Sequence, residues 1–136
     1  MAGCKAQQTE KMLEKTALRH RQISHINAAR SKSAKLKEEM EQLVSSIDKL
    51  NKNGGPKTPE EARKIIGQKE KLDNHYAIFV SKFEKIIPQY EKIGRQKTAK
   101  EIIKLIHTPS NKLLVLFGHR VIREAKEIMD AEKRPQ

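Results

Sequence analysis

The chain has 136 residues and a formal net charge of +12, from 29 Lys and Arg residues against 17 Asp and Glu residues. This length suits one domain around a single hydrophobic core and leaves little room for a second core. The composition excludes an internal disulfide framework, because Cys4 is the only cysteine, and the 36% of hydrophobic residues, placed with helical periodicity, argue against a disordered chain.

The first predicted element is a long helix over residues 9–50, a stretch without proline or glycine. At about 1.5 Å per residue it would be about 60 Å long, which exceeds the width of a compact domain of this size. It should therefore either project from the bundle or break, and a break, as one of these two alternatives, is expected near residues 27–33, where large apolar side chains are missing. Its second half carries a seam that is predicted to pack: Leu36, Met40, Leu43, Ile47 and Leu50. Four upstream apolar residues keep no common phase: Leu13, Leu18, Ile23 and Ile26.

The second predicted helix has the clearest boundary in the chain. Glycines and a proline in residues 54–56 end the first helix, and Thr58 suits the N-cap of the next. Pro59 suits the first helical position, and Glu61 completes a capping box. Interrupted only by Lys69, apolar residues then recur at three-four spacing: Ala62, Ile65, Leu72, Tyr76, Phe79, Phe83 and Ile86.

Two shorter helices are expected in the last third of the chain. Pro88 should end or kink the second helix, and the two outcomes are equally open, because the apolar spacing continues beyond it. A short helix is predicted from Thr98 as N-cap, with Glu101 three residues later, and its core side is Ile102, Ile103 and Ile106. Pro109 is predicted to open the last helix, whose apolar face is Leu113, Leu114, Phe117, Val121, Ala125 and Ile128.

Residues 113–117 could instead form a buried strand, because a short apolar run is ambiguous between the two states, but no second β-rich run is present to pair with it. The sequence therefore predicts an all-α helical bundle of four or five helices with a long or broken N-terminal helix. The expected organisation is a flexible N-terminus over residues 1–8, a long basic helical segment over residues 9–53, and a bundle portion of the same single domain over residues 58–133.

Catalytic machinery is not expected. No two histidines share the i, i+4 spacing of a metal site, and the chain has neither a CxxC nor an HExxH pattern; the histidines are His20, His25, His75, His107 and His119. No GxSxG turn presents a nucleophile, and the glycines form no phosphate-binding loop. The sequence therefore predicts no catalytic residue, no metal, no cofactor and no enzymatic activity.

A basic stretch between Glu14 and Glu38 is the main functional signal, because it contains no acid. Its positive potential attracts phosphates or acidic protein surfaces. The candidate residues for binding an anionic partner are Arg19, Arg21, Arg30, Lys32, Lys35 and Lys37. On a helix they fall on two sides, with Arg21, Lys32 and Lys35 on one of them, and do not form a single stripe.

A secondary basic patch holds only Glu101 as a counter-charge. Its members are Lys92, Arg95, Lys97, Lys100 and Lys104. The two clusters would form one broad cationic surface if they folded side by side, which the sequence does not decide.

The sequence favours a non-enzymatic helical protein-interaction module, such as an adaptor, an inhibitor or an effector-like regulator, that binds an acidic partner surface through a basic face. The alternative is a sequence-tolerant nucleic-acid-binding protein that contacts backbone phosphates, although stacking aromatics and known recognition motifs are missing. A coiled-coil homodimer is a further alternative, because two segments show heptad-like spacing.

Membrane association is less favoured. Apolar residues in the basic stretch are out of phase, so no amphipathic membrane-surface helix is predicted, and the longest apolar run is too short for integral membrane association. The expected location is intracellular and cytoplasmic, with delivery into another cell without a cleavable signal as the alternative.

Overall fold

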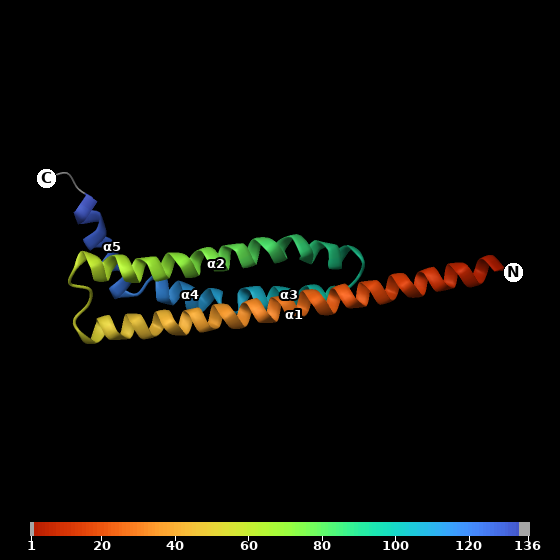
Figure 1. The fold of residues 1–136 in the computed structure, drawn as a ribbon, viewed down its shortest axis with the longest axis horizontal. Helices are drawn as coiled ribbons and strands as arrows, with labels where there is room; N and C mark the ends of the chain where they lie inside the picture. Colours follow the sequence, from red (N-terminus) through yellow and green to blue (C-terminus); the bar gives the residue numbers. More distant parts are fainter. Residues whose placement is uncertain (1, 134–136) are drawn as a thin grey trace.

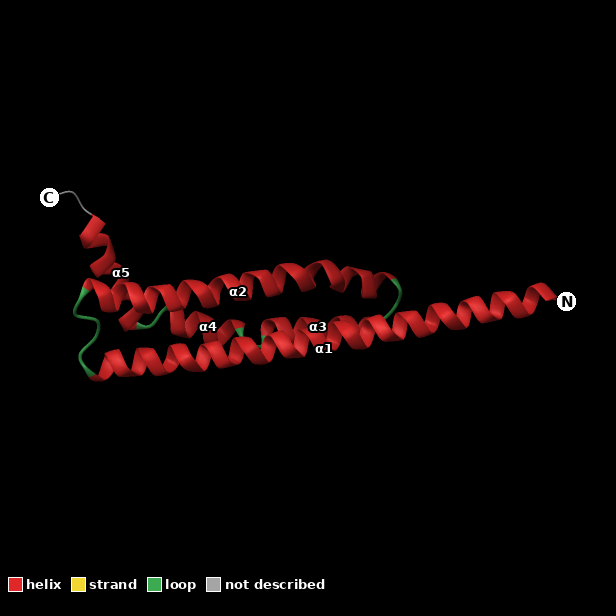
Figure 2. Cartoon of the chain, in the orientation of Figure 1, coloured by secondary structure: helices red, strands yellow, loops and turns green. Residues whose placement is uncertain are grey.

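Five α-helices form the structure, a computed structural model that describes residues 2–133, with side chains described from Met12 onward. They are α1 (Ala2–Lys52), α2 (Pro59–Lys92), α3 (Gln96–His107), α4 (Ser110–Phe117) and α5 (Arg120–Lys133). The described range contains no strand (Figure 2), which confirms the predicted all-α bundle. The strand alternative for residues 113–117 is wrong, because this run is the apolar part of α4 and has no strand to pair with.

Helix α1 is continuous, so the break expected within residues 27–33 does not occur. This segment packs through a small side chain, since Ala29 is completely buried (0% exposed) and lets neighbouring elements approach closely. The N-terminal part of α1 projects beyond the other helices (Figure 1), as expected for an unbroken helix of this length. Residues 2–8, predicted as a flexible N-terminus, lie within the bounds of α1, and their Ala, Lys and Gln residues favour helix.

The N-cap of the predicted capping box at the start of α2 is confirmed, while the Glu61 carboxylate reaches the residue before the cap. Thr58 Oγ1 accepts a hydrogen bond from the Glu61 backbone N–H at 3.1 Å, and the Glu61 carboxylate accepts one from the Lys57 N–H at 3.4 Å. Helix α2 continues through Pro88 to Lys92, so the clean stop considered for this proline is wrong. The buried side chain of Tyr90 packs the last turn of α2 onto the core.

Helices α1 and α2 run antiparallel, and α3 packs against both and returns along α1 (Figure 1). The apolar stripes predicted for α1 and α2 meet in this core, which confirms both of them. The largest fully buried side chains are Phe83, Leu43, Ile47, Ile65, Leu72, Ile102, Ile122 and Val121. Helix α5 packs mainly against α2, and Arg63 Nη1 pairs with Glu132 Oε2 at 2.8 Å.

The start of α3 differs from the prediction, because Thr98 is not an N-cap. Helical hydrogen bonding has already begun before it, since the Ala99 N–H donates to the Arg95 carbonyl at 3.2 Å. Thr98 is buried, and its hydroxyl accepts a hydrogen bond from the Gln22 side-chain amide of α1. A residue that suits a cap is therefore used here to join two helices.

The single last helix predicted from Pro109 is also wrong, because α4 ends at Phe117 and α5 begins at Arg120. His119 lies at the junction, and its Nδ1 accepts a hydrogen bond from the Val121 N–H at 3.1 Å. It satisfies a backbone donor that the first turn of α5 would leave free. The expected shared face also fails at Leu114, which is 72% exposed.

Candidate protein-binding groove and basic face

The structure places the candidate residues of α1 on two flanks of its buried seam, as their helical spacing predicts. Lys32 and Lys35 line a groove between α1 and α2. On the other flank, Lys37 lines a groove between α1 and α4, and Arg30 forms an ion pair with Glu101 of α3. The basic stretch therefore serves two separate surfaces.

Two further candidates, Arg19 and Arg21, are exposed on the part of α1 that precedes these grooves. At 100° per residue, Arg19 falls on the flank of Arg30 and Lys37. Arg21 falls on the other flank, where its charge acts on His25 and on Tyr90 of α2.

The secondary basic patch lies beside α1. All five of its residues are exposed, at the end of α2, in the connection that follows it and on α3. Helix α3 is joined to α1 by the hydrogen bond from Gln22 to Thr98 and by the ion pair of Arg30 with Glu101. The two basic clusters therefore lie on neighbouring elements, and Glu101, the only acid of the patch, is engaged by Arg30.

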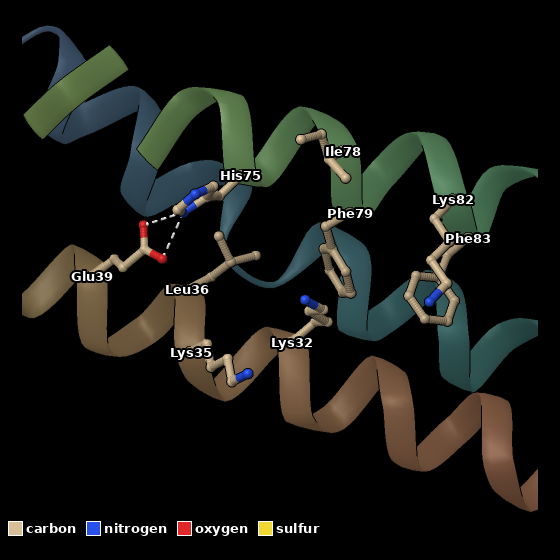
Figure 3. A pocket seen from close by; sticks show the side chains of 9 residues that line it. All are labelled: Lys32, Lys35, Leu36, Glu39, His75, Ile78, Phe79, Lys82 and Phe83. Atoms are coloured by element: carbon tan, nitrogen blue, oxygen red, sulfur yellow. Dashed lines mark hydrogen bonds and ion pairs between the residues drawn. The ribbon is translucent and has the colours of Figure 1, made fainter. Parts of the chain in front are cut away.

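The groove between α1 and α2 has an apolar floor and a cavity volume of about 260 Å³ (Figure 3). Its floor is formed by the buried side chains of Leu36, Phe79 and Phe83. Each lip is a row of residues at i, i+3 and i+7 on one helix: Lys32, Lys35 and Glu39 on α1, and His75, Ile78 and Lys82 on α2.

The charges around this groove are unequal. At one end His75 Nδ1 lies 2.7 and 2.8 Å from the two carboxylate oxygens of Glu39, so the only acid of the lining already has a partner. Among the described residues, Lys32, Lys35 and Lys82 have no carboxylate within ion-pair distance. The Lys82 ammonium lies 5.6 Å from the centroid of the Phe83 ring, a cation–π contact at the floor.

The groove between α1 and α4 has a different character, although its cavity volume of about 320 Å³ is similar. Lys37 and Lys112 lie at its rim together with Glu41, so its charge is mixed. An acidic partner would meet a carboxylate of the same sign there. The groove between α1 and α2 is therefore the better candidate for an acidic ligand.

A polar contact between His25 of α1 and Tyr90 of α2 lies beyond the cationic end of that groove. The Tyr90 hydroxyl is 2.7 Å from His25 Nδ1, and the two rings pack edge to face. Burial, followed by the charges of Lys82 and Arg21, lowers the pKa of His25 and so favours the neutral imidazole, the form whose Nδ1 can accept a hydrogen bond from Tyr90. Burial also raises the pKa of Tyr90, which keeps its hydroxyl protonated as the donor. This pair joins α1 to α2.

Sequence reasoning named Lys32 and Lys35 but missed Ile78 and Lys82 on the opposite lip. The two missed residues lie one turn apart, at the edge of the apolar stripe of α2. That spacing was the only feature of the sequence that pointed to Ile78 and Lys82. The part of α1 that faces them depends on how the two helices pack.

Among residues 12–133, whose side chains the structure describes, no group of three or more His, Cys, Asp and Glu residues could hold a metal ion. Within residues 2–133, every helix is too short or too polar to cross a membrane. Comparison of the chain with protein-family models, curated protein sequences and solved structures gave no match.

Proposed function

We propose that this protein is a non-enzymatic helical interaction module, an adaptor, inhibitor or effector-like regulator. It binds an acidic surface of a protein partner through the basic stretch of α1, between Glu14 and Glu38. The proposal includes the intracellular, cytoplasmic location favoured by the sequence. The observation that carries it is the position of Lys32 and Lys35, two exposed cations without acidic partners beside an apolar groove.

An apolar floor with charged lips suits a protein partner, because protein interfaces combine an apolar centre with a polar rim. Complementary charge at the rim increases the association rate and selects against partners of the wrong sign. A groove lined by three lysines, with its one carboxylate engaged by a histidine, selects for acidic partners by this mechanism.

Sequence-tolerant binding of nucleic acid is the second candidate, and one observation favours it. Helix α3 brings the secondary basic patch next to α1, which widens the cationic surface available to phosphates. Three features count against it. The cations of α1 are divided between two flanks, Arg30 is paired with Glu101, and the aromatic side chains are buried or half-buried and cannot stack on bases.

The test uses the full tagged chain, purified from its native cells after nuclease treatment, and a Lys32→Glu/Lys35→Glu variant. A protein partner should be retained in constant proportion by the wild type and lost by the variant. Lys126→Glu/Lys133→Glu is the matched control, because it makes the same charge change at exposed positions of α5. The proposal fails if nothing is retained after nuclease treatment, or if both variants retain the same partner equally.

A further inference from the structure

We infer that the groove between α1 and α2 docks one acidic amphipathic helix of the partner, with carboxylates held between Lys32 of α1 and Lys82 of α2 and an apolar side chain seated beside the exposed Ile78. This inference rests on the proposed function. It adds the exact surface, a residue row on α2 and the kind of element that the partner presents.

The apolar part of the groove provides a firm contact surface. Phe79 and Phe83 pack edge to face with ring centroids 5.2 Å apart, and both are held in the core from below. Ile78 stands on the lip above them and is 66% exposed, although it is a large apolar side chain. A partner side chain seated beside Ile78 would cover apolar surface that the isolated chain leaves in water.

The cations determine the charge of the occupant. Lys32 and Lys82 come from different helices toward the same part of the groove, while Glu39 and His75 close its other end (Figure 3). Like charges that face each other across a groove repel, and carboxylates placed between them would turn this repulsion into attraction. The occupant should therefore carry Asp or Glu on both sides of its apolar stripe.

The shape of the groove suits a helix. Its lips are ridges of two antiparallel helices with i, i+3 and i+7 spacing, and the ridge of a third helix packs into such a hollow. The volume of about 260 Å³ suits apolar side chains of a helix that lies over the groove. A peptide that binds as an added β-strand would need a free sheet edge, and residues 2–133 form no sheet.

A second copy of this chain does not have the required charge. The formal net charge is +12, and α1 carries no acid between Glu14 and Glu38. Two such helices would repel each other. Nucleic acid supplies the negative charge but offers a phosphate backbone, which gains nothing from the apolar floor.

The experiment selects peptides of about 18 residues, about five helical turns, from a displayed random library on the full chain. Recovered peptides should place Asp or Glu on both sides of apolar residues at i, i+3 or i+4, and i+7. In fluorescence anisotropy titrations, Lys32→Glu/Lys82→Glu should weaken their binding by about tenfold or more, which corresponds to about 1.4 kcal/mol. Ile78→Asp should weaken it as well, because it puts a carboxylate on the lip.

Two matched variants locate the effect. Arg19→Glu/Lys37→Glu makes the same charge change on the other flank of α1 and should weaken binding less than Lys32→Glu/Lys82→Glu does. Lys126→Glu/Lys133→Glu makes it on α5 and should leave the affinity within about twofold. All the altered side chains are exposed, so circular dichroism should show the wild-type helix content for each variant.

The possible results separate this inference from the proposed function. If binding is lost in Arg19→Glu/Lys37→Glu and kept in Lys32→Glu/Lys82→Glu, the groove between α1 and α2 is not the docking site. The proposed function, binding of an acidic partner by the basic stretch of α1, would still hold. Recovered peptides without an acidic bias, or a selection that recovers no binding peptide, would overturn the inference. Acidic peptides that lack an apolar stripe would also overturn it, because the floor would then have no role.

Discussion

His25 links the stability of this fold to pH. Burial and the charges of Lys82 and Arg21 lower its pKa in the folded state from the ordinary value of 6.5. The unfolded chain therefore binds more protons than the folded chain in the interval between these two pKa values. Stability contributed by neutral His25 is complete above about pH 6.5 and is lost as the pH falls from there through the lowered pKa of the folded state.

Urea unfolding followed by circular dichroism between about pH 7 and about pH 5 tests this link, because histidine changes charge in that range. The wild type should lose stability on acidification, and His25→Gln should lose less of it, since glutamine does not titrate. His20→Gln is the control, because His20 is exposed and should leave the wild-type dependence unchanged. An equal loss in wild type and His25→Gln would show that His25 is not the group responsible.

Among the helices, α2 has the best-defined start, and Thr58 is the residue that defines it. Its hydroxyl accepts the Glu61 N–H, one of the donors that a helix start leaves free. Thr58→Ala should lower the free energy of unfolding by about 1 kcal/mol. Thermal or urea unfolding measures this loss, and Thr58→Ser, which keeps the hydroxyl, should restore most of it. If Ala and Ser behave alike, the cap does not stabilise α2.

Local patterns were sufficient for the elements whose signals lie in one stretch of chain. The apolar stripes of α1 and α2 and the capping box at Thr58 follow from spacing and residue type alone. The failures have a different origin. Thr98 suits a cap locally, but the structure uses it to bind Gln22 of α1, and after the break between α4 and α5 the side chains of Val121 and Ile122 are buried in the core.

Only one side of the candidate site, the lip on α1, could be predicted from the sequence. Lys32 and Lys35 stand out because they belong to a basic stretch without acids, which is visible in the sequence. Lys82 resembles any solvated helix lysine until the structure places it on the opposite lip. A groove formed by two helices depends on their relative position, which no single segment of sequence specifies.

At the scale of the whole molecule, the bundle divides its excess charge among several faces. Arg30 is neutralised by Glu101, and Arg63 by Glu132, while Lys37 shares its groove with Glu41. The groove between α1 and α2 differs, because its lysines lie beside exposed apolar surface and its one carboxylate is held by a histidine. Because of this combination we propose this groove, and not the other charged faces, as the binding surface.

A charge-swap titration tests the central claim most directly. The affinity of wild type and of Lys32→Glu/Lys35→Glu is measured for a recovered acidic peptide and for the same peptide with its acids replaced by lysine. If the lysines of the groove meet carboxylates of the partner, each single change should weaken binding, and the double change should restore much of it. Binding that stays equally weak when both sides are reversed would contradict the account.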